Sequence, residues 1–355
     1  MLMAKNSFKL ALRLAVIVAC WTNQEGRAQS SIHLYGTVDL GVRYSTNQTL
    51  SGSNLVELTP GASATSKLGI NGREDLGKGT AAIFTLESAL NPDTGELEDA
   101  SVLFSKQSWL GIEGPFGQVT VGRQYTPLYN AEWAIEPFGL VNPYESSFIY
   151  GNYGGGTNWD NSLMYSATAG GFTGVLMTAL GEKAGDTQAG RSWGASLAYA
   201  DELLTFNTAY QRAHNDQRYV ASEAWNIGGS VYLKPIRLFL GYLHHQSELT
   251  SQKNEVYHTG FIYDIEPNLE LIGGYYHDKQ RAVDGKKQTV SAMLTYRFSE
   301  RTAVYVQTDY SKIDAGYSLN IFDSMKFPAS QNSDGEISTF APSRTSFMMG
   351  IRHNF

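Results

Sequence analysis

The sequence RTSFMMGIRHNF, residues 344–355, alternates between two kinds of side chain along its length. Odd positions are mostly apolar, whereas even positions include Arg344, Arg352 and Asn354. Because successive side chains of a β-strand point to opposite faces, this pattern predicts a strand with one apolar and one polar face. A soluble sandwich could show the same alternation, but the terminal aromatic Phe355 favours a strand whose apolar face meets lipid.

The composition also favours β structure. The 355 residues include 21 Tyr, 16 Phe and 36 Gly, and the mean hydropathy is −0.26. Past the N-terminus, no apolar run approaches the roughly 18 residues that a spanning helix needs. Because only helices and closed barrels satisfy every backbone polar group in lipid, a membrane location requires a barrel.

The N-terminal residues 1–28 have the pattern of a secretory signal peptide, which would leave 29–355 as the mature domain. Three basic residues precede an apolar stretch over 14–21, and Ala28 offers a small-residue cleavage site. The alternatives are a membrane anchor, for which the stretch is short, and a lipoprotein signal that would acylate Cys20. Cleavage after Ala28 removes Cys20, the only cysteine, and with it any disulfide or thiolate chemistry.

The predicted mature chain is acidic. Residues 1–28 hold four basic residues and one acid, so the remainder has 23 Lys and Arg against 33 Asp and Glu, a net charge of −10. This charge argues against nucleic acid as a partner. His244, His245 and His258 lack a carboxylate or cysteine at the spacing of a metal site, so we expect no metal and no other cofactor. The absence of a Gly-x-Ser-x-Gly motif argues against a hydrolase.

Turn signals divide the mature chain regularly, with seven short breakers alternating with eight longer polar stretches. The short breakers lie at residues 76–79, 114–117, 169–171, 200–202, 234–235, 266–267 and 299–301, and the longer stretches lie near 46–62, 91–100, 126–157, 182–190, 214–222, 247–254, 279–287 and 312–343. An even strand number, with short turns at one rim and long loops at the other, is typical of a transmembrane barrel. The pattern predicts sixteen antiparallel strands.

The period of two recurs in individual segments. In SIHLYGTVDLGVRY, residues 31–44, one face holds Ile32, Leu34, Val38, Leu40 and Val42, and the other holds His33, Tyr35, Thr37, Asp39 and Arg43. Residues 236–245 differ, because apolar residues occupy both faces. Such mixing is expected where a wall packs on a neighbouring subunit or on an inserted loop.

Four stretches of the chain resemble general bacterial porins of the Gram-negative trimeric type, most closely those of β-proteobacteria. The stretches are SSIHLYGTVDLGVRY, SKLGINGREDLGKGTAAIFTLES, SWLGIEGPFGQVTVGRQYTPLYNA and GIRHNF. The resemblance implies an all-β fold: a 16-stranded antiparallel transmembrane β-barrel with an inward-folded third loop. It also implies a homotrimer in the outer membrane, in contact with lipid and lipopolysaccharide, with Phe355 as the signal for barrel assembly.

The resemblance places the inward-folded loop at residues 126–157, where Glu136-Pro-Phe-Gly139 is similar to the acidic tip of the family. Two positions depart from the family pattern. Leu140 stands in place of the second glycine of the tip, and Asn158 stands where the family often has an arginine. The second departure predicts a weaker basic side of the constriction.

The alternation of side chains along each strand predicts which basic residues face the pore. Leu68 and Ile70 have the parity of a lipid-facing side, so Lys67 and Arg73 face the lumen, with Lys67 at mid-strand and Arg73 near the periplasmic mouth. The parity of Lys106 is ambiguous, but placing a charge in lipid costs a few kcal/mol, which favours the lumen.

The remaining site predictions follow from loop position and parity. Arg43 and Asp39 share the lumenal face of the first strand and are predicted to contribute charge to the pore, with Arg43 at the outer vestibule. Glu132 and Glu136 lie on the inserted loop and are expected to oppose the lysines, which would set a transverse field across the pore. Arg123 has outward parity and is predicted to form an ion pair at the trimer contact.

The predicted function is passive diffusion of small hydrophilic solutes and ions across the outer membrane. The alternative for each basic residue is a solvated wall position with little influence on selectivity. The alternatives for the whole protein are a solute-specific channel or, with less support, a barrel enzyme or an adhesin.

Overall fold

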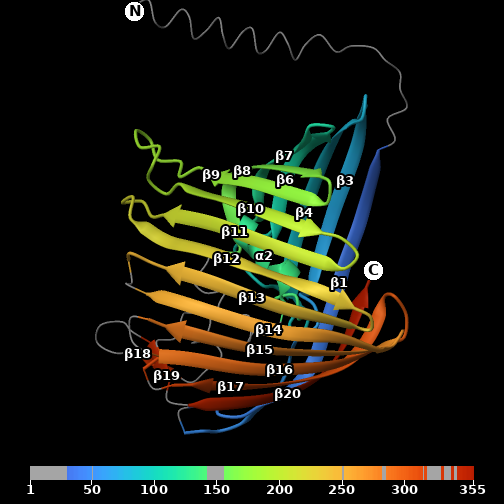
Figure 1. The fold of residues 1–355 in the computed structure, drawn as a ribbon, viewed down its shortest axis with the longest axis vertical. Coiled ribbons are helices and arrows are strands. Elements are labelled where there is room, and N and C mark those ends of the chain that lie inside the picture. The colour runs from blue at the N-terminus through green and yellow to red at the C-terminus, as the bar shows by residue number, and fades with distance from the viewer. Residues whose placement is uncertain are drawn as a thin grey trace, which may run out of the picture.

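The computed structural model describes residues 30–49, 51–141, 156–249, 252–281, 285–314, 316–317, 329–331, 337–339 and 342–355. These residues form a closed antiparallel barrel of sixteen strands, with one short helix enclosed by the wall (Figure 1). No helix in these ranges is long and apolar enough to cross a membrane.

The barrel wall consists of β1 (Ser31–Ser45), β2 (Leu55–Pro60), β3 (Lys67–Gly77), β4 (Thr80–Asn91), β6 (Gln107–Gly114), β7 (Gly117–Tyr125), β8 (Asn158–Ala169), β9 (Phe172–Ala179), β10 (Ser192–Ala200), β11 (Leu204–His214), β12 (Val220–Leu233), β13 (Ile236–Gln246), β14 (Lys253–Glu266), β15 (Leu269–Gln280), β16 (Gly285–Arg297), β17 (Thr302–Ile313) and β20 (Ser343–Asn354). Outside the wall, β5 (Glu96–Leu97) extends the end of β4, β18 (Ala329–Gln331) pairs with β19 (Ile337–Thr339), and α2 (Pro127–Ile135) lies between β7 and β8. The predicted 16-stranded barrel is thus confirmed.

The second strand of the barrel is split into β2 and β3. The sequence predicted a loop over 46–62, but residues 55–60 of that range pair with the upper part of β1, and the strand resumes at Lys67. Both halves pair with the same neighbour, so β2 and β3 count as one strand of the wall. The intervening residues 61–66 are not paired with β1 as a strand.

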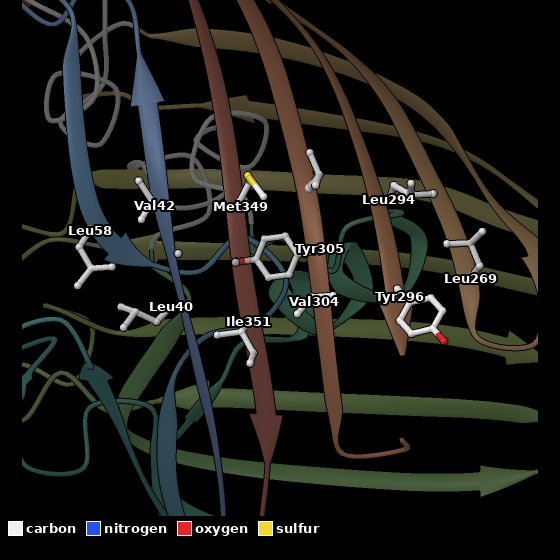
Figure 2. A pocket seen from close by; sticks show the side chains of 13 residues that line it. Leu40, Val42, Leu58, Leu269, Leu294, Tyr296, Val304, Tyr305, Met349 and Ile351 are labelled. Carbon is white, nitrogen blue, oxygen red and sulfur yellow. The ribbon is translucent and has the colours of Figure 1, made fainter. Parts of the chain in front are cut away.

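The outer face of the wall is apolar, as the two-residue period predicted. Along β1, Leu34 and Val42 are more than half exposed, and along β20 the exposed side chains include Met349 and Ile351. Figure 2 shows such side chains around a shallow apolar hollow where β1, β17 and β20 run side by side. A band of exposed apolar side chains suits contact with the hydrocarbon of a membrane.

The barrel closes where β1 pairs with β20, and the last residue takes part in the closure. Gly36 and Phe355 exchange two backbone hydrogen bonds, each 3.1 Å from nitrogen to oxygen. The Phe355 ring covers Gly36 so closely that a Cβ atom there would lie 2.4 Å from Cζ of the ring and 2.7 Å from the Lys67 carbonyl oxygen. Only glycine fits under the terminal aromatic.

Gly36→Val is therefore expected to destabilise the closed barrel. Overpacking of this kind costs about 1–3 kcal/mol. The measurement is the temperature at which the folded form disappears on a gel of incompletely heated samples, which should fall. Gly174→Val is the matched control, because no atom lies within 4 Å of a Cβ at Gly174. Equal thermal stability of the two variants would contradict the role of Gly36.

Candidate functional site

The inserted segment begins with a capped helix. Thr126 is the N-cap of α2, and its side chain accepts a hydrogen bond of 3.2 Å from the Tyr129 backbone nitrogen. Pro127 occupies the first turn, where its missing N–H leaves no bond unmade. The helix buries Leu128 and Ala131 in a cluster that includes Leu243 of β13. The apolar inner face of 236–245 thus packs on the inserted loop, one of the two explanations that the sequence left open.

Glycines of the wall let the inserted segment approach the backbone closely. A Cβ atom at Gly228 of β12 would lie 2.4 Å from Cδ1 of Ile135, and one at Gly260 of β14 would lie 2.6 Å from Cγ of Pro137. Side chains at these positions would push the segment toward the centre of the pore. The glycines therefore fix how far the loop projects into the lumen.

Glu136 holds the tip of the loop together. Its carboxylate accepts hydrogen bonds from the backbone nitrogens of Phe138 (3.1 Å) and Leu140 (2.7 Å), and from the Tyr276 hydroxyl of β15. Leu140 has φ +55°, the left-handed backbone conformation that a glycine adopts without strain. Its side chain is fully buried in the loop–wall cluster, which offsets that strain.

Glu132 is also directed at the wall rather than at the open lumen. Its carboxylate accepts a hydrogen bond of 2.8 Å from Asn226 Nδ2 and lies 3.1 Å from His258 Nε2, and both Glu132 and His258 are fully buried. The expectation that Glu132 and Glu136 face the lysines across the pore is thus corrected. The helix positions Glu132 on the same side as its apolar residues, and Glu136 follows directly at the C-cap, so both carboxylates anchor the loop.

A cavity lies on the other side of α2. Its volume is about 450 Å³, and it separates the inserted segment from a part of the wall that includes Thr37 of β1, Lys67 of β3 and Lys106, which directly precedes β6. Lys67 and Lys106 line its wall side, and Tyr129, Trp133 and Phe138 line the loop side. The structure therefore brings the two predicted lysines together on one cavity. Their facing side chains are aromatic rather than acidic.

Each lysine has an acidic partner on its own side of the cavity. Lys67 Nζ lies 3.0 Å from Oε2 of Glu87, a buried residue of β4, and Lys106 Nζ lies 2.8 Å from Oε2 of the exposed Glu98. Asn158 donates a hydrogen bond of 2.6 Å to the Lys106 carbonyl and so fixes its backbone. Glu87 shares the lumenal parity of its strand and could have been found from sequence, whereas Glu98 lies in a loop and gave no signal.

Two arginines of the predicted site lie away from the constriction. Arg73 binds Glu113 at 2.9 Å near the short-turn rim, where the sequence placed it. Arg43 is almost fully buried against Met348, with Nη2 3.4 Å from Sδ, which corrects the expectation of an open vestibule position.

Arg123 and Asp39 both have partners within the chain. Arg123 projects from the outer side of β7, and its ion pair, 2.7 Å to Asp160, lies within the chain. Asp39 is fully buried, and its carboxylate accepts hydrogen bonds from the backbone of residues 63 and 64 and from Tyr305. Within the described ranges, no group of His, Cys, Asp and Glu is arranged to hold a metal ion.

Glu136→Ala should loosen the loop tip, because it leaves the buried Phe138 and Leu140 backbone nitrogens without acceptors, at about 1–3 kcal/mol for each lost partner. Single-channel recordings should show added current noise from movement of the loop. Glu202→Ala, which removes an exposed acid from the turn between β10 and β11, is the control. Quiet currents from Glu136→Ala would contradict the anchoring role.

Comparison with known proteins agrees with this architecture. Residues 14–316 match the family described as Gram-negative porin. Outer membrane porin protein 32 of Delftia acidovorans is 25% identical, over 98% of this chain and 99% of that protein. Major outer membrane protein P.IB of Neisseria meningitidis serogroup B is 26% identical, over 78% of this chain and 75% of that protein.

Solved structures share the fold. The anion-selective porin from Comamonas acidovorans has a TM-score of 0.77 at 24% identity, covering 92% of this chain and 100% of that one. OmpT of Vibrio cholerae in its trimer form has a TM-score of 0.66 at 13% identity, covering 92% and 99%. The matched family, the closed 16-stranded wall and the narrowed lumen lead to one conclusion: the chain belongs to the Gram-negative porin family and is a diffusion channel of the outer membrane.

Proposed function

We propose that the channel passes small hydrophilic solutes with a weak preference for anions, set at the cavity between α2 and the wall. The observation that carries the proposal is the position of Lys67 and Lys106 on one cavity. In a narrow pore, charged side chains beside the path act strongly on a passing ion. In the wider mouths, mobile ions screen such charges within about 8–10 Å.

The local charge balance supports a weak preference rather than a strong one. Glu132 and Glu136 are buried against the wall, so neither presents an acid to the passage. Glu87 is buried beneath Lys67, and its carboxylate is shared with the Tyr35 hydroxyl at 2.9 Å. In the described part of the chain, the exposed acid that pairs with a lysine of the cavity is Glu98. The similar porin from Comamonas acidovorans is anion-selective, which supports the same sign.

Neutralising the two lysines tests the proposal. The double variant Lys67→Gln with Lys106→Gln should shift the zero-current potential in a salt gradient toward cations, because the positive charge at the constriction is lost. Arg73→Gln removes one charge at the periplasmic mouth and should shift the potential less. If the two variants shift the potential equally, the constriction does not set ion preference.

Glu98→Gln should shift the potential in the opposite direction. It leaves the ammonium group of Lys106 at the cavity without its exposed counter-charge, 2.8 Å away in the structure. Planar-bilayer recording in a salt gradient measures this shift. The control is Glu96→Gln, which removes an exposed acid from the same connection between β4 and β6. A shift toward cations would contradict the proposed role of the pair.

We also propose that the mature protein is residues 29–355, assembled as a homotrimer among outer-membrane lipid and lipopolysaccharide. The trimer form of the related OmpT structure supports trimerisation. Mass spectrometry of the purified protein would give the N-terminus, and an unheated gel would give the oligomer. A mature chain that begins before residue 29, or a monomer on the gel, would count against the corresponding part.

A further inference from the structure

The break between β2 and β3 is a detour into the lumen. The β1 ladder pairs Thr37 with Lys67 and Leu40 with Pro60. Two β1 residues, Val38 and Asp39, therefore stand opposite the six residues 61–66. We call these six residues the strand detour. An ordinary β-bulge opposes two residues to one, so this insertion is larger than a bulge and displaces its chain from the wall.

Asp39 binds both ends and the middle of the strand detour. Its backbone oxygen accepts hydrogen bonds from Gly61 N at 2.9 Å and from Ser66 Oγ at 3.0 Å. Its Oδ2 accepts from the backbone nitrogens of Ser63 at 3.0 Å and Ala64 at 2.7 Å. The carboxylate thus replaces the strand partner that the detour has lost.

Two further strands hold the strand detour in place. The Tyr305 hydroxyl of β17 donates to Asp39 Oδ1 at 2.8 Å and accepts from Ala62 N at 2.9 Å. Arg352 Nη1 of β20 donates to Ser63 Oγ at 2.9 Å. Asp39, Ala62 and Tyr305 are all buried. The anchoring network therefore joins β1, β17 and β20 across the seam of the barrel.

Close packing shows that the strand detour has one fitted position. A Cβ atom at Gly61 would lie 1.8 Å from Asp39 Oδ1, so only glycine lets the chain turn inward over this carboxylate. Side chains of residues 63–65 line the same 450 Å³ cavity as Trp133 and Phe138 of the inserted segment. The passage is therefore bounded by the loop on one side and by the strand detour on the other.

We propose that the strand detour is a second lip of the constriction, which sets the size limit of the channel together with α2. Asp39 and Tyr305 are positioning residues that hold this lip in the lumen. The role of Asp39 is then geometric, in contrast to the pore charge that the sequence predicted. The proposal concerns the width of the passage and is independent of the proposed anion preference.

Deletion of residues 62–65 is the direct test. It leaves Gly61 and Ser66 opposite Val38 and Asp39, which restores one-for-one pairing. Planar-bilayer recording should show a higher single-channel conductance, and liposome swelling should show faster uptake of large sugars relative to small ones. Unchanged conductance and sugar discrimination in a correctly assembled deletion variant would overturn the proposal.

Point variants distinguish a role of Asp39 in positioning the strand detour from a role of its charge. Tyr305→Phe removes one hydroxyl and no charge, and it should raise conductance, whereas Tyr310→Phe on the lipid-facing side of the same strand should not. Asp39→Ala should raise conductance more than Asp39→Asn, because asparagine keeps an acceptor oxygen for the detour. Equal effects of Asp39→Asn and Asp39→Ala, with a shifted zero-current potential, would assign Asp39 to charge and overturn its positioning role.

A labelling experiment covers the case in which the deletion does not fold. Ala64→Cys places a thiol on the lip, and modification with an anionic methanethiosulfonate reagent should lower the conductance of the open channel. Val56→Cys on β2 is the control, because Val56 is 66% exposed on the outer face. A modified Ala64→Cys channel, verified by mass, with undiminished current would place the strand detour outside the constriction and overturn the proposal.

Discussion

Backbone hydrogen bonding in lipid is the constraint on which this structure depends. An unpaired peptide group in hydrocarbon costs several kcal/mol, so a sheet that spans a membrane must close on itself. Here β1 pairs with β20 from Thr37 opposite Asn354 to Ser45 opposite Ser346, and Phe355 extends the closure to Gly36. Gly36 and the aromatic ring of Phe355 therefore pack against each other where the barrel closes. Every other feature of the pore is built inside the ring that this closure completes.

The lumen inside that ring is divided unequally. The inner faces of β11 to β15 carry apolar and small residues that receive the inserted segment, including Leu243, Gly228 and Gly260. On the other side of the inserted segment a cavity remains beside β1 and β3, where Lys67 and Lys106 lie. The pore is therefore narrow because one half of a wide barrel is filled by its own loop. Its path follows the polar half of the wall.

Buried carboxylates in this channel serve as anchors. Glu136 accepts two backbone N–H groups at the loop tip, and Asp39 accepts two at the strand detour. In both places the chain leaves regular structure, and its N–H groups need acceptors that no neighbouring strand supplies. A carboxylate that accepts several hydrogen bonds meets that need. Among the described residues, Glu87 and Glu98 are instead the ion-pair partners of Lys67 and Lys106.

The sequence by itself determined the wall of the barrel. The two-residue period assigns each strand residue to the lipid or the lumenal face. Turn-forming residues mark the short turns that lie at one rim of the barrel. Both signals are local in the sequence. It therefore predicted the sixteen strands, the third loop, and Lys67 on the lumenal face. It did not predict that Glu132 would be buried, although Glu132 lies four residues after Leu128 and so on the same face of a helix.

Only the tertiary structure decided which groups meet across the lumen. The partner of Glu136 is Tyr276, 140 residues away, and the partner of Asp39 is Tyr305, 266 residues away. No local period specifies such pairs, because they depend on the curvature of the closed sheet and on how far the loop enters it. The strand detour was hidden for the same reason: its six residues resemble a polar loop until the ladder shows that they face two residues of β1. The faces of the strands are a local property of the chain, whereas the shape of the pore is a property of the closed barrel.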